Sequence, residues 1–400
     1  MNQFADHPEP NGTGSEQPEQ PEISLARGLT TAALVLVALG LALVFARSAT
    51  TSALIFVVIL VSLVVAHALA HFFTAKMFGV HVLEFGVGFP PKIFGKRFGE
   101  TEYTVNWLPL GGFVRLLGEE DPTAPRSLAR KPAWQRLVVL AAGSVMNLIL
   151  PIVLFAFAFT VPHEVPTGRA TVSAVSPDAP AAAAGLKSGD IILSVGGRES
   201  KNVIDAGRLI RLNTGRETEI RIRRGTEDLT LHVTPRWAPP AGQGPTGIQI
   251  AAQNTFTEMQ SLPPWQSLPL GAQSTWDTMV LARNEVLSWV KGGVRPQVAG
   301  PVAIAQTTGE VAREGGLSPL LELAALLSIN LGIMNLLPLP MLDGGRALFV
   351  VIEVLRRGRR IAPEREAMVH LVGFVLFITL AIVVTFGDIS RIVRGDSLFK

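Results

Sequence analysis

The chain contains no cysteine, and charged residues make up only 17% of it. The first absence excludes disulfides and thiolate metal sites, so any metal site must be built from His, Asp or Glu side chains. The second leaves the chain well below the roughly one-quarter charged content of a soluble domain. With 35 basic and 32 acidic residues, the formal net charge of +3 gives no indication of a nucleic-acid partner.

Long apolar runs take the place of the missing charge. Five runs are long enough to span a bilayer, and they cover residues 29–46, 52–75, 137–161, 319–342 and 368–386. Lys and Arg concentrate between the second and third runs and between the fourth and fifth, which predicts that these loops are cytoplasmic. The sequence therefore predicts a multi-pass protein of the cell (inner) membrane, surrounded by lipid. Its N-terminus would be cytoplasmic, and its long segment between the third and fourth runs would lie outside.

Two histidines, His67 and His71, lie inside the second apolar run. Residues four apart share one face of a helix, so this pair can present two imidazole nitrogens to one metal ion. In the H-E-x-x-H motif of zinc proteases, the residue after the first histidine is a glutamate that acts as general base. Ala68 occupies that position here. The sequence therefore has the ligand frame without the base.

The fourth apolar run ends in a proline-rich stretch followed by Asp343. Pro338 and Pro340 are expected to unwind the helix just before the aspartate. A carboxylate at such a position is costly in a membrane and is by default a functional hypothesis. His67 lies ~22 Å below the outer end of its run at 1.5 Å per residue, which is a depth similar to that of Asp343. The sequence thus predicts a zinc site made by His67, His71 and Asp343 with an open fourth position, the pattern of catalytic zinc.

Two other segments carry patterns of their own. Residues 84–119 contain short β-type runs punctuated by Gly and Pro, which at membrane depth must be covered by protein or line a water-filled cavity. Residues 165–236 alternate strands, a short alanine-rich helix and glycine turns, and the stretch 176–192 resembles the signature of a PDZ domain. PDZ domains bind peptides by adding them to a sheet edge. Residues 237–264 are Pro- and Gly-rich and predict a linker.

An amphipathic helix is expected over residues 270–291. Trp276 and Trp289, with Trp265 just before the helix, would anchor it at the outer membrane surface. The alternative is a surface helix that packs on the preceding domain. The sequence leaves both open.

The motifs and their order along the chain resemble those of the site-2 protease family of intramembrane zinc metalloproteases. The resemblance is closest to the bacterial, PDZ-containing branch that cleaves anti-sigma factors, and it covers roughly residues 52–390. It rests on the histidine pair, the PDZ signature and three further stretches, 110–119, 142–147 and 300–304, and it ends in the run 335–344. The resemblance implies hydrolysis of a peptide bond within the transmembrane segment of a single-span protein. It also implies zinc as cofactor, with a catalytic site near the cytoplasmic side.

The resemblance also implies roles for individual residues. His67, His71 and Asp343 would bind zinc. The substrate channel would be shaped by Asn335, Pro338 and Pro340, and the membrane-reentrant β-structure would include Gly111, Gly112 and Phe113. The expected fold is a polytopic α-helical membrane protein of about five transmembrane helices with a membrane-reentrant β-segment and an inserted α+β PDZ domain.

The predicted organisation has six parts. They are a disordered cytoplasmic tail (1–24), an extra transmembrane helix (25–50), the first half of the membrane core (51–164), an extracytoplasmic PDZ domain (165–236), a linker with an amphipathic helix (237–298), and the second half of the core (299–400). The first transmembrane helix is a departure from four-span members, and its role is open. The PDZ domain could act as a size filter for substrates, bind peptides, or be purely structural.

Ala68 has two explanations. One is an engineered Glu-to-Ala change that keeps metal and substrate binding but blocks turnover, and the other is a natural pseudoprotease. The remaining chemistry-bearing residues are all present, which favours the first. A scaffold that binds membrane proteins through its PDZ domain is a separate hypothesis. A metal transporter is disfavoured, because the first, third and fifth runs offer only Asn147 and His370 as strong polar candidates.

Overall fold

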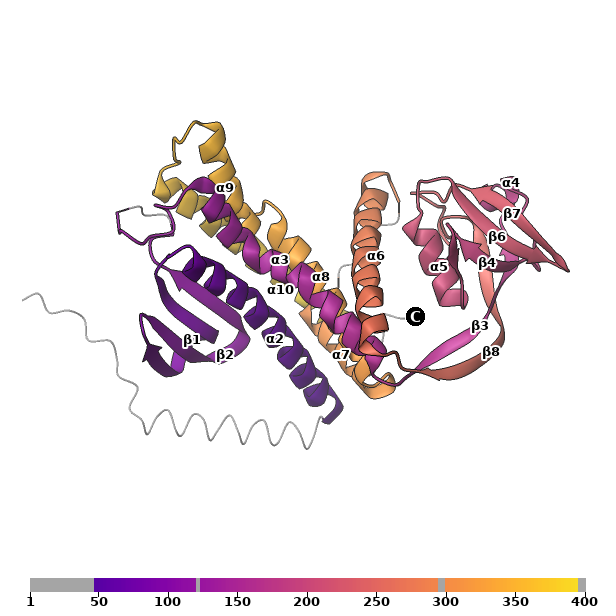
Figure 1. Cartoon of the computed structure of the whole chain (residues 1–400), viewed down its shortest axis with the longest axis horizontal. Coiled ribbons are helices and arrows are strands. Elements are labelled where there is room, and N and C mark those ends of the chain that lie inside the picture. The colour runs from indigo at the N-terminus through magenta and orange to yellow at the C-terminus, as the bar shows by residue number, and fades with distance from the viewer. Residues whose placement is uncertain (1–46, 120–122, 294–298, 395–400) are drawn as a thin grey trace, which may run out of the picture. The chain divides into compact units, whose positions relative to one another are not determined.

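The computed structural model describes residues 47–119, 123–293 and 299–394 (Figure 1). The predicted tail 1–24 and the first apolar run lie outside these residues. Four described helices are long and apolar enough to cross a membrane. They are α2 (Arg47–Met77), α3 (Ala133–Thr160), α8 (Leu317–Leu336) and α10 (Pro363–Val393), and they match the other four apolar runs of the sequence.

The fourth apolar run is shorter as a helix than the sequence predicts. The expected end is residue 342, but α8 ends at Leu336 and Leu337 is extended, with φ −64° and ψ 143°. A residue that precedes proline is pushed out of the helical region, and Pro338 itself has no N–H to continue the hydrogen-bond ladder. The chain then turns through residues 337–342 before α9 (Asp343–Leu355) begins. A broken helix therefore presents Asp343 at the start of a new helix.

The predicted β-type segment forms one antiparallel hairpin, β1 (Val82–Phe98) and β2 (Thr101–Leu116). The hairpin is folded so that Phe85 of β1 lies opposite both Tyr103 and Val114 of β2. The first half of β1 is thus flanked on both sides by β2. In the part of the chain that the structure describes, no strand pairs with the outer edge of residues 112–116, which is therefore a free sheet edge.

Apolar contacts and a charge cluster hold this hairpin against α2 (Figure 1). Phe72 and Ala75 of α2 share a buried cluster with Phe85. At the hairpin turn, Glu100 forms ion pairs of 2.5 Å with Arg126 and with Lys76 at the end of α2. Hydrogen bonds from Arg126 and Lys76 hold the pKa of Glu100 at about 2. The hairpin is therefore fixed beside the histidine-bearing face of α2.

The second β-sheet belongs to the α+β segment between α3 and α6. Its strands run in the order β7-β6-β4-β3-β8, with β5 paired to β4. The elements are β3 (His163–Val175), α4 (Pro180–Ala183), β4 (Ile191–Val195), β5 (Arg198–Glu199), α5 (Val203–Leu212), β6 (Thr218–Arg224), β7 (Glu227–Val233) and β8 (Ile248–Gln260). The fully buried side chains of Val172, Ile220 and Ile222 lie at its centre. Apolar residues at alternate positions of the strands face this core.

Strand β8 corrects the predicted domain boundary at residue 236. The sequence predicts a linker over 237–264, but residues 248–260 pair with β3 along almost its whole length, from His163 opposite Gln260 to Val175 opposite Ile248. The Pro- and Gly-rich stretch concealed the strand, because only residues 237–247 carry that composition. The α+β segment therefore extends from β3 to β8.

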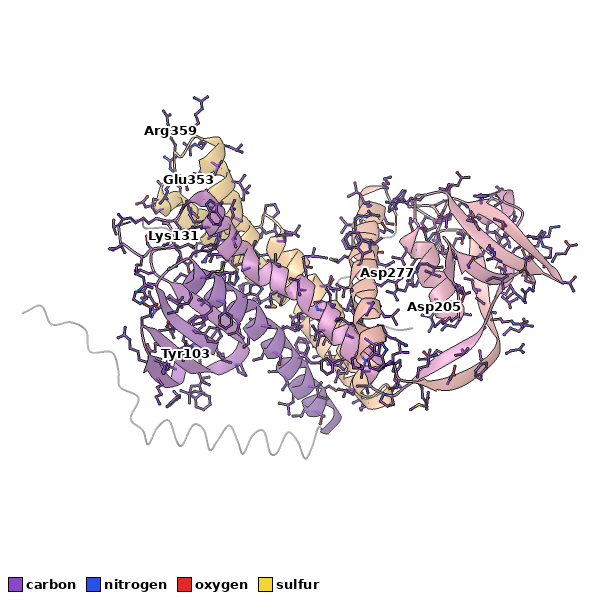
Figure 2. All side chains as sticks on the ribbon, in the orientation of Figure 1. Tyr103, Lys131, Asp205, Asp277, Glu353 and Arg359 are labelled. Carbon is purple, nitrogen blue, oxygen red and sulfur yellow. The ribbon has the colours of Figure 1, made fainter. Side chains whose placement is uncertain are left out.

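Helix α6 (Pro264–Val290) contacts the α+β segment with its polar face and α3 with another face. The buried carboxylate of Asp277 (Figure 2) accepts a hydrogen bond of 2.9 Å from Arg198 and lies 3.3 Å from Arg208 of α5. Asn284 donates to the last carbonyls of α5, including that of Arg211 at 2.9 Å. Of the predicted anchors, Trp276 remains 65% exposed. The helix thus contacts the domain and also keeps an apolar exposed face. Packing on the domain and anchoring at the membrane surface, the two alternatives from the sequence, are therefore compatible with each other.

The remaining helix, α7 (Pro301–Glu314), is tied to α10 by a buried carboxylate. Asp388 is 2% exposed and accepts backbone hydrogen bonds from Gly300 at 3.3 Å and Ala303 at 3.0 Å. A carboxylate at this position satisfies amides that have no partner within the helix. The cap therefore fixes the start of α7 against the last spanning helix.

We expect Asp277→Ala to loosen the α+β segment from α6, because two arginines lose their shared, buried partner. Amide hydrogen exchange at the end of α5 should become about tenfold faster, which corresponds to ~1.4 kcal/mol of local stability. Asp228→Ala is the matched control, because Asp228 pairs with Arg223 on the exposed β6–β7 hairpin. Equal exchange rates in the wild type and Asp277→Ala would contradict this account of the contact.

Candidate metal centre

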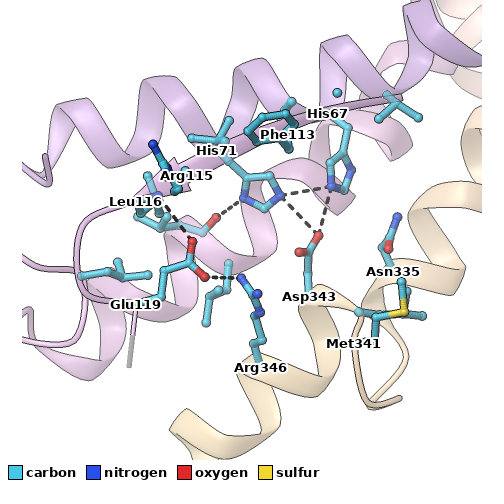
Figure 3. Close-up of a pocket in the computed structure, with 18 of the residues that line it drawn as sticks. His67, His71, Phe113, Arg115, Leu116, Glu119, Asn335, Met341, Asp343 and Arg346 are labelled. Carbon is cyan, nitrogen blue, oxygen red and sulfur yellow. Dashed lines mark hydrogen bonds and ion pairs between the residues drawn. The ribbon is translucent and has the colours of Figure 1, made fainter. Parts of the chain in front are cut away.

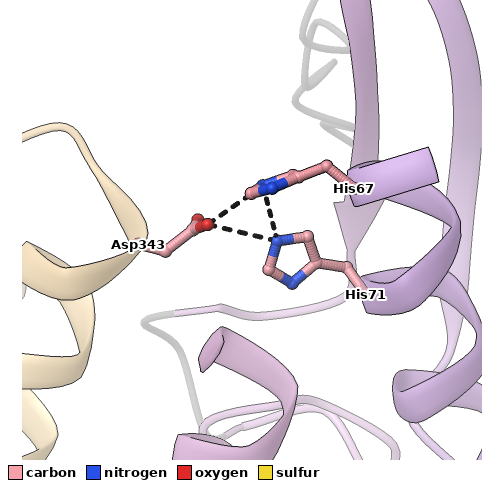
Figure 4. A group of neighbouring side chains, drawn as sticks. All are labelled: His67, His71 and Asp343. Atoms are coloured by element: carbon pink, nitrogen blue, oxygen red, sulfur yellow. Dashed lines mark hydrogen bonds and ion pairs between the residues drawn. The ribbon is translucent and has the colours of Figure 1, made fainter. Parts of the chain in front are cut away.

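His67 and His71 lie one turn apart on the same face of α2 and turn their rings toward each other. Their Nε2 atoms are 3.1 Å apart, and each ring is mostly buried. Figure 4 shows Asp343 approaching the pair from α9. One oxygen of its carboxylate, Oδ2, lies 3.1 Å from Nε2 of His67 and 3.3 Å from Nε2 of His71. The structure thus brings together the three residues that the sequence selects as metal ligands.

Two glycines after Asp343 allow this approach. A Cβ atom on Gly344 would lie 2.3 Å from the carbonyl oxygen of Leu337, and one on Gly345 would lie 2.1 Å from that of Leu339. Any side chain at either position would push α9 away from the turn that precedes it. Met341 in the same turn has φ +78°, and its N–H donates to Nδ1 of His370 at 2.7 Å. Close backbone packing and a strained residue therefore set the position of Asp343.

The spacing of the three donor atoms is close to that around a tetrahedral zinc ion. With metal–ligand distances of 2.0–2.2 Å, neighbouring ligand atoms of a tetrahedron are ~3.3–3.6 Å apart. The observed separations of 3.1, 3.1 and 3.3 Å are close to this range. Two imidazoles and one carboxylate also form a known catalytic donor set, which leaves a fourth position free.

Gly143 of α3 leaves open the space beside the two ring nitrogens. A Cβ atom at this residue would lie 2.3 Å from Nε2 of His71 and 2.5 Å from Nε2 of His67. These distances are only slightly longer than a metal–nitrogen bond. The absence of a side chain at residue 143 therefore preserves the volume next to both nitrogens, and the residues present fit a zinc ion.

The other ring nitrogens face α3. Nδ1 of His71 lies 2.7 Å from the carbonyl oxygen of Val139, and Nδ1 of His67 lies 3.1 Å from the side-chain amide of Asn147. Metal-binding histidines commonly use their second nitrogen in this way. Both histidines are thus held at both ring nitrogens.

A cavity of about 850 Å³ opens onto the three residues (Figure 3). Its lining includes Ala68, Asn335 and the free-edge strand residues Gly112 and Phe113. The other residues selected from the sequence lie near it but are not part of the lining. Gly111 contacts Phe89 and Val64, and Pro340 packs on Gly373 of α10. Pro338 ends α8, so these residues have structural rather than lining roles.

Ala68 is 3% exposed and faces the cavity next to His67. The cavity has one other carboxylate besides Asp343 among the described residues, that of Glu119. Glu119 accepts a short hydrogen bond from Arg346 of α9 and lies 3.4 Å from the backbone N–H of Leu116 (Figure 3). Among the described residues, the cavity therefore has no further carboxylate, free of an ion pair, in place of the one missing at residue 68.

Sequence reasoning assigned no role in the site to Gly143, Val139, Glu119 or Arg346, although Gly143 and Glu119 lie in stretches that carry the family resemblance. A signal exists for the first, because Gly143 and Asn147 are four residues apart in an apolar run and therefore share a helix face. Nothing in the sequence indicates that this face meets α2. The carbonyl of Val139 has no sequence signal at all.

We expect Gly143→Ala to abolish zinc binding by the purified full-length chain, because the added methyl group would occupy the space beside both Nε2 atoms. Gly207→Ala on α5 is the matched control, since a Cβ there meets no atom within 4 Å. Zinc per chain is measured by inductively coupled plasma mass spectrometry after dialysis. Stoichiometric zinc in Gly143→Ala would show that the metal does not bind in this space.

Comparison with known proteins identifies the family. The profile of Peptidase family M50 matches residues 55–380. A Clostridium perfringens protein named as a zinc metalloprotease is 35% identical over 81% of this chain and 94% of its own length. The regulator of sigma-W protease RasP of Bacillus subtilis is 29% identical over 82% of this chain and 95% of its own. The zinc metalloprotease RasP of Oceanobacillus iheyensis is 30% identical over 82% and 96%, respectively.

The Clostridium perfringens and Oceanobacillus iheyensis relatives are zinc metalloproteases by name, so zinc is the expected cofactor. The family and the apolar helices together indicate a multi-pass membrane protein. The match covers more than three quarters of the chain and includes α2, α3, α8 and α9. The chain therefore belongs to Peptidase family M50, the site-2 protease family.

Proposed function

We propose that this chain binds one zinc ion through His67, His71 and Asp343 in a site for intramembrane proteolysis, and that it holds substrates without cleaving them. The observation that carries the proposal is the convergence of the three donor atoms at 3.1–3.3 Å in a cavity whose wall at residue 68 is alanine. When bound, zinc polarises a scissile carbonyl and lowers the pKa of a water molecule.

The substrate class is a single-span membrane protein, such as an anti-sigma factor, presented as an unwound segment. A transmembrane helix keeps each carbonyl bonded to the amide four residues on, so its peptide bonds must be freed before hydrolysis. The free edge of residues 112–116 lines the cavity and offers unpaired backbone groups to an extended peptide. Asn335 lies on the opposite side of the cavity, where its amide can contact the same segment.

The missing step is proton transfer. In the zinc-protease motif the glutamate after the first histidine takes a proton from water and passes it to the leaving amine. Ala68 has no titratable group, and Glu119 is held by Arg346. Removing a general base costs roughly 10²–10⁴-fold in rate. The intact remainder of the site favours an introduced Glu-to-Ala change, and a natural pseudoprotease is the alternative.

The placement of the chain in the membrane follows from its charges. We propose an inner-membrane protein whose loops 76–136 and 346–365 face the cytoplasm, because both are rich in Lys and Arg. The α+β segment would then be an extracytoplasmic PDZ domain. Its role would be to exclude substrates whose outer domain has not been trimmed, with peptide binding at the domain as the alternative.

We expect Ala68→Glu to give cleavage of a single-span reporter protein in proteoliposomes, at least 10²-fold above the parent chain, because the carboxylate restores the proton acceptor. Ala68→Gln is the matched control, since it has the same shape without the base. Cleavage is followed by gel electrophoresis and mass spectrometry of the products.

An Ala68→Glu variant that binds zinc and captures the reporter, yet leaves it intact, would contradict the explanation of Ala68 as an introduced change. It would favour a scaffold that binds membrane proteins.

The same variant tests the role of the α+β domain. Full-length and pre-trimmed reporters should be cleaved at different rates if the domain filters by size, and equal rates would exclude the filter.

A further inference from the structure

Asn147 lies fully buried in α3, and the nitrogen of its side-chain amide, Nδ2, is 3.1 Å from Nδ1 of His67. An amide buried in an apolar helix is costly unless a hydrogen bond compensates for it. Among the described residues, this side chain has no hydrogen bond other than that to His67, and its Oδ1 has no partner. No other hydrogen bond therefore fixes which amide atom, Oδ1 or Nδ2, faces the ring of His67, and the position of the ring proton decides it.

The chemistry of the ring decides which amide atom must face it. His67 directs Nε2 toward Asp343 and His71, so a metal bound there requires Nε2 without a proton. In the neutral ring the proton then resides on Nδ1, which becomes a donor. Only the oxygen of an amide can accept it. A half-turn of the amide about its last torsion exchanges Oδ1 and Nδ2 with almost no change in shape, and places Oδ1 at Nδ1.

His71 has a matching arrangement that cannot be reversed. Its Nδ1 lies 2.7 Å from the backbone carbonyl oxygen of Val139, which can only accept a hydrogen bond. This contact fixes the proton on Nδ1 and leaves Nε2 free for a metal. Two acceptors therefore serve the two rings, one from the backbone and one from a side chain.

The three α3 residues that meet the histidines are spaced by four. Val139, Gly143 and Asn147 follow one another along one face of the helix, at one turn each. The first supplies an acceptor to His71, the second leaves the space beside both Nε2 atoms, and the third meets His67. Ser328 of α8 donates to the backbone carbonyl oxygen of Asn147 at 2.9 Å, which holds this turn of α3 in place.

We propose that Asn147 is a positioning residue of the metal centre. It accepts the Nδ1 proton of His67 and thereby selects the tautomer and the ring orientation that leave Nε2 free for the metal. The inference rests on the proposed function, because it requires His67 to be a ligand. Partners of this kind typically change metal affinity by about 10–100-fold when they are removed.

Three full-length variants in detergent micelles test the role, with Co²⁺ as the spectroscopic probe. Asn147→Leu keeps the volume but removes the acceptor, and we expect it to weaken Co²⁺ affinity by about 10–100-fold. Asn147→Asp keeps an acceptor of the same shape, and we expect its affinity to be at least that of the wild type. Ser144→Ala is the matched control, because Ser144 is also fully buried on α3 and its Oγ makes no hydrogen bond, to the histidines included, in the described structure.

A second measurement observes the proton on the His67 ring directly, and its first part needs no variant. In the Zn²⁺-loaded wild-type chain, ¹⁵N NMR of the histidine rings should show a protonated, slowly exchanging Nδ1 on His67. Loss of that slow exchange in Asn147→Leu, with the signal of His71 unchanged, is the expected signature of a lost acceptor.

The outcomes separate the two levels of the account. Equal affinities in Asn147→Leu and the wild type, or equal losses in the Leu and Asp variants, would overturn the role of Asn147 while leaving the metal site intact. A rapidly exchanging Nδ1 in the loaded wild type would overturn it as well. If the parent chain, with Ala68 and Asn147, failed to bind Co²⁺ or Zn²⁺, the proposed function would be overturned, and this inference with it.

Discussion

Two imidazoles on the face of an apolar helix are the constraint on which the centre of this protein depends. Polar groups at such a position need partners, and neither lipid nor the apolar side chains of α2 can supply them. The structure satisfies both rings at both nitrogens, with Asp343 and the opposite ring on one side and α3 on the other. Three features make these contacts possible: α8 ends before Asp343, two glycines follow Asp343 at the start of α9, and α3 has no side chain at Gly143.

The same arrangement explains why the site is open. A structural zinc site has four protein ligands and no open position, whereas here three candidate ligands converge and a cavity of about 850 Å³ leads to them. One wall of the cavity is the free edge of the β1–β2 hairpin, fixed to α2 by apolar packing and by the ion pairs of Glu100. Irregular backbone and an unpaired strand edge are tolerated at membrane depth only beside such a cavity. On the proposed function, this cavity would receive an extended peptide, and Ala68 is where proton transfer would be lost.

The sequence indicates the elements of this account whose signals are local. The spacing of His67 and His71 predicts a shared helix face, and Pro338 predicts a break before Asp343. Four apolar runs of the sequence match described helices. The end of α8 at Leu336 differs from the expectation, because a proline acts on the residue before it. Strand β8 differs as well, because a short Pro- and Gly-rich stretch concealed the strand that follows.

What could not be predicted depends on contacts between distant parts of the chain. Gly143 matters only because α3 crosses α2 at that point, and the carbonyl of Val139 is not a property of its side chain. Glu119 stands at the end of a recognisable motif, but its pairing with Arg346 follows from the fold of the hairpin against α9. The roles of these residues depend on which distant segment each one meets, and local residue patterns do not show that.

The central claim is that His67, His71 and Asp343 hold one zinc ion although the residue at position 68 is alanine. The most direct test is the zinc content of the purified full-length chain and of His67→Ala, measured by inductively coupled plasma mass spectrometry after identical dialysis. The account predicts about one zinc per chain in the first and almost none in the second. Equal zinc content in both proteins, or none in either, would contradict it.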